Sequence, residues 1–165
     1  MNPLLQDIFA EAQKIVDLAT TKQWRIATAE SCTGGLIGGA ITAIPGSSTP
    51  FKGGIIAYDN AIKTKLLGVS PSVLGKYGAV SEKTAERMAA GARERLDVDL
   101  AVSVTGIAGP GGAVEGKPIG TVWIGIATKD AVSATVFNFG DIGRNAVRDQ
   151  TVLEALRMLT GALEG

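Results

Sequence analysis

The chain has 165 residues, of which 45% are hydrophobic, and its 16 Lys and Arg residues balance 16 Asp and Glu residues. This length and composition fit one globular domain, expected over residues 1–165, and the balanced charge gives no reason to expect nucleic acid or an anionic membrane as a partner. Histidine is absent, which excludes a Ser-His-Asp triad, a Cys-His pair and any histidine-liganded zinc site. If the protein is an enzyme, its general base is therefore a lysine, a carboxylate or a tyrosine.

The single cysteine, Cys32, excludes an internal disulfide and a thiolate metal cluster. It favours a reducing compartment, so we expect a cytoplasmic protein in which Cys32 is a packing residue. The N-terminus has a charged amphipathic pattern rather than that of a signal peptide, and no apolar run approaches the roughly 20 residues that cross a bilayer. We therefore expect no membrane association, no metal and no cofactor.

Hydrophobic periodicity and turn residues predict helices and strands that alternate along the chain. Ser81 is a good N-cap, and Gly38 and Gly39 within a predicted helix favour close packing of that helix on a neighbour. In chain order, the predicted elements are a helix over 3–21, a strand over 25–29, a helix over 34–43, a strand over 53–58, a helix over 61–67, a helix after Ser81, a strand over 100–104, a hairpin of 122–124 with 132–139, and a helix over 144–163. This order predicts a three-layer α/β/α sandwich with a mostly parallel or mixed central sheet.

Each of the first three predicted strands ends in a polar cluster. The clusters are Glu30–Gly35 after the first strand, Tyr58–Asn60 with Lys63 one turn later after the second, and Thr105 with Gly106 after the third. Parallel strands have their carboxyl ends at one edge of a sheet, where open α/β sheets bind ligands. The helix predicted between the first two strands favours parallel pairing, so we expect the three clusters to face one crevice.

In the absence of histidine, a serine nucleophile with a lysine base fits these residues best. A serine hydroxyl needs a neighbouring base, and a lysine can serve when burial or nearby positive charge lowers its pKa. Tyr58 precedes Lys63 by five residues, so it can orient Lys63 or relay its proton in a shared pocket. Backbone amides within Thr33–Gly35 or at Gly106 can form an oxyanion hole.

Each of these residues also has a structural interpretation. Ser31 and Thr33 are good helix caps. Lys63 can be an ordinary solvated helix residue, and Tyr58 can be a half-buried strand residue. Glu30 can cap a helix, pair with a lysine or act as a base.

Two further patterns concern phosphate binding. Residues 111–117 match G-x-x-x-x-G-K, but Pro118 replaces the Ser or Thr that would bind magnesium, and a strand is predicted where a P-loop opens a helix. Arg144 and Arg148 lie at i, i+4 near the start of the last helix, so both guanidinium groups can face one anion. The alternative for these arginines is a solvated face that pairs with nearby acidic residues.

Several long stretches carry a resemblance to a known family. They are TAESCTGG, IPGSSTPFKGGIIAYDNAIK, LGV, GAVSE, SVTGIAGPGG and KPIGTVWIGIAT, over about residues 28–128, followed by GDIGRNAVRDQ. In these stretches the chain resembles the C-terminal domain of the competence-damage-inducible CinA family, the nicotinamide mononucleotide deamidases. The resemblance covers essentially the whole chain and implies a free-standing amidohydrolase domain over residues 1–165.

The resemblance implies hydrolysis of the carboxamide of nicotinamide mononucleotide to nicotinate mononucleotide and ammonia, by a Ser/Lys mechanism without metal or cofactor. It implies Lys63 as general base and either Ser31 or Ser48 as nucleophile. The predicted strands favour Ser31, because Ser48 precedes the second strand and would lie near its opposite end. An irregular loop or a neighbouring subunit can still bring Ser48 in, so both serines stay open.

The remaining site residues are expectations from the same resemblance. We expect Tyr58 to relay a proton and Arg148 to contact the substrate phosphate. The residues expected to bind the rest of the substrate are Thr33, Gly34, Gly35, Thr105, Gly106 and Gly109. Where the family pattern has a serine after the tyrosine of the second strand, this chain has Asp59.

Two functions from different classes follow from this reading. The first is the deamidase, with nicotinamide mononucleotide as its small-molecule partner. The alternative is a pyridine-nucleotide-binding module that keeps the pocket, lacks turnover and regulates a partner. The resemblance also implies a homo-oligomer, expected to be a symmetric dimer.

Overall fold

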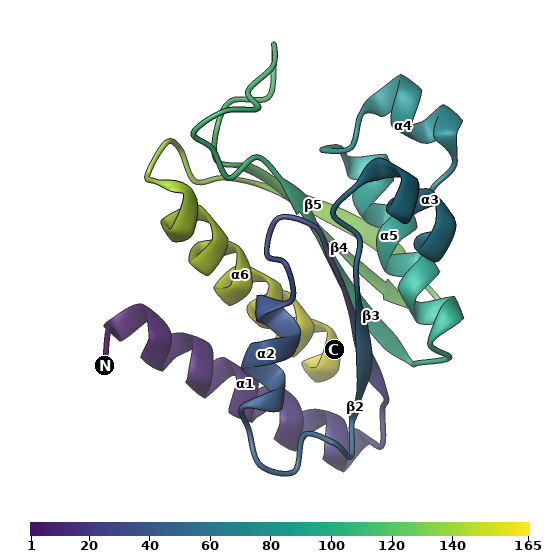
Figure 1. Ribbon diagram of the computed structural model, residues 1–165. Coiled ribbons are helices and arrows are strands. Elements are labelled where there is room, and N and C mark those ends of the chain that lie inside the picture. The colour runs from purple at the N-terminus through teal and green to yellow at the C-terminus, as the bar shows by residue number, and fades with distance from the viewer.

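The computed structural model describes residues 1–165 and contains one five-stranded mixed sheet (Figure 1). Its strand order is β2-β1-β3-β4-β5. β1 pairs in parallel with β2 and β3, whereas β4 is antiparallel to both β3 and β5. The strands are β1 (Ile26–Glu30), β2 (Phe51–Ile56), β3 (Leu100–Gly106), β4 (Thr121–Thr128) and β5 (Val132–Asn138). The predicted mixed sheet and its hairpin are confirmed.

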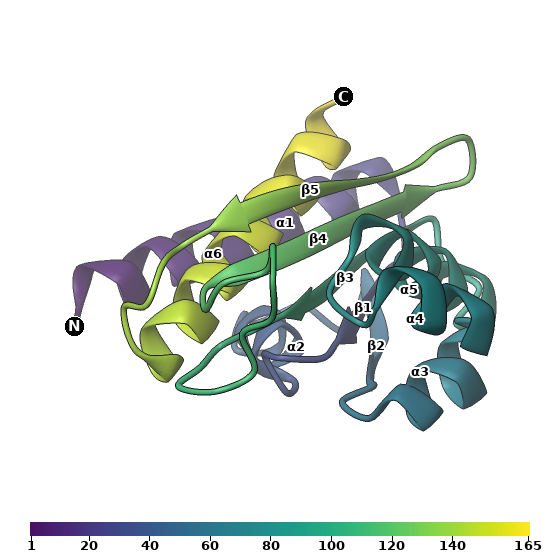
Figure 2. The same cartoon turned by 90° about the horizontal axis from the view of Figure 1, so that it is seen from above.

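Six helices cover the two faces of the sheet and complete the predicted α/β/α sandwich. One face is covered by α1, α2 and α6, and the other by α3 and α5, with α4 packed on α5. The view from above in Figure 2 shows the sheet between these two groups. The helices are α1 (Pro3–Lys22), α2 (Leu36–Thr42), α3 (Asn60–Leu67), α4 (Pro71–Tyr77), α5 (Glu82–Arg95) and α6 (Arg144–Glu164). None of them is both long and apolar enough to cross a bilayer.

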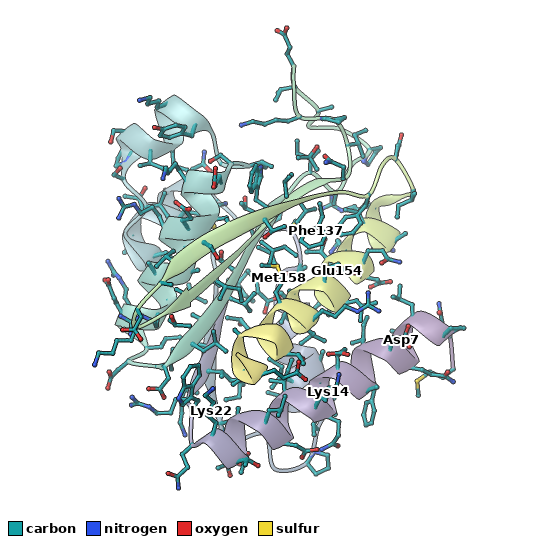
Figure 3. All side chains as sticks on the ribbon, turned by 180° about the vertical axis from the view of Figure 1, so that it is seen from behind. Asp7, Lys14, Lys22, Phe137, Glu154 and Met158 are labelled. Atoms are coloured by element: carbon teal, nitrogen blue, oxygen red, sulfur yellow. The ribbon has the colours of Figure 1, made fainter.

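Two hydrophobic cores lie on opposite faces of the sheet. Every residue of β1 is buried, as expected for a strand with helices on both sides. The larger core contains 23 buried residues from the sheet, α1, α2 and α6, and the smaller contains nine from the other face. Figure 3 shows the α1 and α6 face from behind, where Met158 of α6 and Phe137 of β5 pack against the larger core.

Helix α4 was not predicted from the sequence. Ser70 caps it and Pro71 occupies its first turn, which are ordinary start signals. None of its seven residues is fully buried, and only Val73 and Leu74 pack against the smaller core, so the segment has too short an apolar pattern to mark it as a helix.

Helix α2 begins without a side-chain cap at its own N-cap position. That position is Gly35, whose φ of 101° turns the chain into the helix. The buried carboxylate of Glu30, the last residue of β1, accepts hydrogen bonds from the amide of Ile37 at 2.9 Å and from that of Gly38 at 3.0 Å. The strand therefore ends in the group that caps the helix of the following crossover.

Two threonine hydroxyls complete the surroundings of the Glu30 carboxylate. Thr33 Oγ1 donates to one oxygen at 2.7 Å, and Thr28 Oγ1 donates to the other at 3.2 Å. Glu30 thus accepts two hydrogen bonds on each oxygen, as an ionised carboxylate does. Among the roles left open for Glu30, capping is the one observed, and the interpretation of Ser31 and Thr33 as the caps is wrong.

The glycines of α2 differ in their surroundings. A Cβ atom on Gly38 would lie 3.4 Å from Phe51 Cζ and 3.5 Å from the Glu30 carboxylate, so the expected close packing is confirmed there. The same expectation is wrong for Gly39, where a Cβ atom would meet nothing within 4 Å.

Replacing Glu30 by Gln is expected to destabilise the fold by about 1–3 kcal/mol, the range for buried donors left unsatisfied. In either orientation, the amide NH₂ group would face a backbone N–H of α2, which cannot reverse its polarity. Denaturant unfolding measures the change. The control is Glu154→Gln, because Glu154 pairs with Arg157 at the surface and such pairs contribute only about 0–1 kcal/mol. Equal effects of the two substitutions would contradict the anchoring role of Glu30.

Candidate active site

The carboxyl ends of β1, β2 and β3 meet at a cavity of about 250 Å³. It lies at the edge of the sheet that is uppermost in Figure 1, where the glycine-rich loop after β3 protrudes. All three polar clusters contribute residues to its wall, so the prediction of a single crevice is confirmed. The polar and glycine residues of the wall that matter below are Ser31, Tyr58, Lys63, Thr105, Gly106, Gly109 and Arg144.

The central contact in this cavity joins Lys63 and Ser31. Lys63 Nζ lies 3.1 Å from Ser31 Oγ and donates at 3.0 Å to the backbone carbonyl of Tyr58. Lys63 is only 1% exposed and is therefore not the solvated helix residue that its sequence context also allowed. The start of α3 fixes the position of Lys63. The Asp59 side chain caps this helix, and the backbone carbonyl of Asp59 accepts a hydrogen bond from the amide of Lys63.

Burial changes the pKa values of the two ionisable side chains next to Ser31, which are Lys63 and Cys32. Desolvation lowers the pKa of Lys63 below its ordinary value of 10.5, against the opposing effect of the nearby Asp59 carboxylate. Burial also raises the pKa of the Cys32 thiol to about 12, so this thiol stays protonated near neutral pH. Burial thus shifts the amine beside the Ser31 hydroxyl toward its neutral form and leaves the Cys32 thiol unreactive.

Tyr58 holds Lys63 through its main chain rather than through its phenol. The Tyr58 side chain is 63% exposed, and its Oη accepts a hydrogen bond from Arg144 Nη2 at 3.2 Å. The backbone carbonyl of Tyr58 is the second partner of Lys63. Of the two expected roles, orientation of the lysine has a contact in the structure, and that contact is a backbone one.

The end of β3 forms the opposite wall of the cavity. Thr105 Oγ1 donates to the carbonyl of Ala79 at 2.7 Å, which ties β3 to the loop between α4 and α5. A Cβ atom on Gly106 would lie 2.6 Å from Val122 Cγ2, so only glycine fits there. Ala79 and Val80 also line the cavity but were not named from the sequence, because small apolar loop residues carry no chemical signal.

The cavity wall offers unpaired backbone donors. The amides of Cys32, Ala108 and Gly109 have no hydrogen-bond acceptor within the protein, and all three residues line the cavity. Gly34 and Gly35, which were expected to contribute amides or bind substrate, lie outside the wall and turn the chain into α2 with φ of 59° and 101°. Candidate oxyanion donors are thus found beside Ser31 and after β3.

Ser48 lies away from this cavity. It is exposed in the loop that precedes β2, whereas the cavity lies beyond the other end of that strand. Within the chain, no irregular loop brings Ser48 to Lys63. The serine in contact with Lys63 is Ser31.

The two arginines at the start of α6 have different surroundings. Arg144 lines the cavity, where its Nη1 donates to the carbonyl of Gly109 at 2.8 Å and its Nη2 to Tyr58 Oη. The i, i+4 spacing pairs Arg144 with Arg148, and the expectation from the sequence is that Arg148 contacts the phosphate. Arg144, and not Arg148, contacts the loop after β3 at the cavity. The spacing of the two arginines in the sequence does not reveal this difference.

Arg148 and Thr33 lie behind the Ser31 turn and do not line the cavity. Arg148 Nε donates to the carbonyl of Cys32 at 3.1 Å, and its Nη2 donates to the carbonyl of Thr33 at 3.3 Å. The hydroxyl of Thr33 is bound to Glu30. Neither side chain lines the cavity, and the expectation that they contact substrate directly stays a prediction.

Comparison with known proteins identifies the family. A family model described as the CinA C-terminal domain matches residues 9–163. A CinA-like protein of Parasynechococcus marenigrum is 50% identical over 135 residues, which are 81% of this chain and 32% of that protein. A CinA-like protein of Synechocystis is 50% identical over 141 residues, or 84% of this chain and 34% of that protein. The chain thus spans about a third of the length of the curated relatives it matches.

A solved structure of similar length has the same fold. The crystal structure of the competence/damage inducible protein CihA from Agrobacterium tumefaciens superposes with a TM-score of 0.93 at 44% identity, covering 96% of each chain. Sequence family, identity and fold agree over nearly all residues. The chain belongs to the CinA family and corresponds to its C-terminal domain.

Proposed function

We propose that the chain is a metal-independent Ser/Lys amidohydrolase that converts nicotinamide mononucleotide to nicotinate mononucleotide and ammonia. The observation that carries this proposal is the 3.1 Å contact between Ser31 Oγ and the buried Lys63 Nζ. Membership of the CinA family supports it, and the stretches in which the chain resembles the nicotinamide mononucleotide deamidases include both residues.

In the acylation step, neutral Lys63 accepts the Ser31 proton while Ser31 Oγ attacks the carboxamide carbon. A lysine whose pKa is lowered by burial is suited to this role, because its lone pair is free nearer to neutral pH. The oxyanion of the tetrahedral intermediate is stabilised by backbone amides, for which Cys32 and Ala108 are the candidates. Lys63 then returns the proton to the nitrogen, the C–N bond breaks, and ammonia leaves from an acyl-Ser31 ester.

Deacylation repeats the chemistry with water as the nucleophile. Lys63 takes a proton from water, the hydroxide adds to the ester carbonyl, and the C–O bond to Ser31 breaks as the proton returns to Oγ. The products are nicotinate mononucleotide and free enzyme. Tyr58 contributes by holding Lys63 in place through its backbone carbonyl.

We assign substrate recognition to the rim formed by α6 and the loop after β3. Arg144 is the arginine that lines the cavity, beside the exposed phenol of Tyr58, so we assign the substrate phosphate to it in place of Arg148. Gly106 and Gly109 contribute no side chain to the opposite wall, and Thr105 shapes that wall through its hydrogen bond to Ala79.

Ammonia release from nicotinamide mononucleotide, measured in EDTA, tests the proposal. Ser31→Ala and Lys63→Met are each expected to lower kcat by roughly 10²–10⁴-fold, the usual contribution of a general base and its nucleophile. Ser48→Ala is the matched control and is expected to retain activity, because Ser48 lies outside the cavity.

Calorimetric titration with nicotinamide mononucleotide separates the deamidase from the binding module. Binding without ammonia release by the folded wild-type protein would favour the module. A dead Ser48→Ala with an active Ser31→Ala would reverse the assignment of the nucleophile.

The pH profile tests the role of Lys63 as base. The rate is expected to rise with pH and to level off above the pKa of Lys63, with a midpoint below 10.5, because only the neutral amine accepts a proton and burial lowers its pKa. Asp59→Asn removes a charge that opposes this lowering while keeping a good N-cap, so the midpoint is expected to move to lower pH. A midpoint that does not respond to Asp59→Asn would argue against Lys63 as the titrating group.

A substrate pair tests Arg144. Arg144→Met is expected to lower kcat/KM for nicotinamide mononucleotide by roughly 10–100-fold, the value of a lost hydrogen bond between charged groups. Nicotinamide riboside lacks the phosphate, so its turnover is expected to change little, which also controls for the loss of the contact to Gly109. Equal losses for both substrates would contradict phosphate binding by Arg144.

A further inference from the structure

The turn that carries Ser31 receives its outer support from one side chain of α6. The amide of Ser31 donates to the carbonyl of Val104, and the amide of Gly34 closes the turn on the carbonyl of Ser31. The carbonyl of Cys32, between these bonds, accepts a hydrogen bond from Arg148 Nε and from no other protein group. Arg148, more than a hundred positions along the chain, thus supplies the hydrogen bond to the backbone carbonyl of the residue that follows Ser31.

The guanidinium of Arg148 spans two consecutive carbonyls. Its Nε reaches Cys32 O at 3.1 Å and its Nη2 reaches Thr33 O at 3.3 Å, while Nη1 rests on Asn145 Oδ1 at 3.3 Å. A planar fork with fixed donors defines the orientation of both peptide groups, which a single ammonium group cannot do. Because Ser31 and Cys32 are joined by one peptide bond, rotation of this turn would move Ser31 Oγ relative to Lys63 Nζ.

We propose that Arg148 is a positioning residue that holds the turn after β1 so that Ser31 Oγ faces Lys63 Nζ. The proposal rests on the proposed function, in which Ser31 is the nucleophile. It divides the i, i+4 arginine pair of α6 between two tasks. Arg144 faces the cavity, and Arg148 braces the nucleophile turn from behind.

The steady-state test compares Arg148→Met, Arg148→Lys and the control Arg157→Lys, which lies on the same helix and pairs only with Glu154. Loss of the brace is expected to lower kcat for nicotinamide mononucleotide by roughly 10²-fold in Arg148→Met, since a misplacement of about 1 Å in a reacting group has that effect. KM is expected to stay within about threefold, because Arg148 does not line the cavity. Arg148→Lys keeps the charge but not the fork, so it is expected to show an intermediate loss. A raised KM with unchanged kcat would overturn the proposal in favour of substrate binding.

A second readout measures the nucleophile without the substrate. A fluorophosphonate forms a P–O bond with Ser31 Oγ as its P–F bond breaks, fluoride leaves and the serine proton passes to Lys63. Intact-mass kinetics give the labelling rate, and Ser31→Ala identifies the labelled residue. Arg148→Met is expected to slow labelling by a factor similar to its loss of kcat, while Arg157→Lys labels at the wild-type rate.

The two readouts distinguish failure of this proposal from failure of the proposed function. Wild-type labelling at Ser31 without ammonia release would reject the deamidase, and the Arg148 variants would still test the brace through their labelling rates. Fast labelling of Arg148→Met would overturn the brace whatever its activity. Absence of wild-type labelling at Ser31 would overturn both. If thermal unfolding shows that Arg148→Met does not fold, Arg148→Lys decides by the same criteria.

Discussion

The buried carboxylate of Glu30 is the interaction on which the geometry of the site depends. A helix that starts directly behind a buried strand brings unpaired amides into the interior, where each unsatisfied donor costs about 1–3 kcal/mol. Glu30 satisfies two of these amides from the last position of β1, and two threonine hydroxyls occupy its other acceptor positions. Ser31 follows immediately, with its amide bonded to β3, so the anchor of the crossover also places the proposed nucleophile.

Burial has a different consequence at Lys63, whose charged form is not surrounded by hydrogen-bond partners. The carboxylate of Glu30 is buried with a full set of donors, whereas the amine of Lys63 is buried with only Ser31 Oγ and the Tyr58 carbonyl as partners. Desolvation therefore lowers the pKa of the lysine, which suits the base of the proposed mechanism. The same interior thus surrounds the Glu30 carboxylate with hydrogen-bond donors and lowers the pKa of the Lys63 amine.

The site is assembled from segments that are distant in sequence. Three parallel strands deliver Ser31, Lys63 and Thr105 to one edge, and the start of α6 adds Arg144 and Arg148 from the far end of the chain. Backbone carbonyls hold three of the side chains: the carbonyl of Tyr58 holds Lys63 within one strand exit, whereas those of Ala79 and Cys32 bind Thr105 and Arg148 from distant segments. Main-chain acceptors of this kind depend on the fold and leave no mark in residue identity.

The sequence by itself determined the α/β class, most of the elements, the family and the absence of a histidine base, because periodicity, composition and motifs are local properties. It also placed Lys63 and Ser31 at neighbouring strand exits, since parallel strands must end at one edge. Only the tertiary structure decided that Ser31 rather than Ser48 contacts Lys63 and that Arg144 rather than Arg148 lines the cavity. Those choices depend on which end of β2 a loop occupies and on which carbonyls a guanidinium meets. Both are set by contacts between segments far apart in the chain, which spacing along the sequence does not encode.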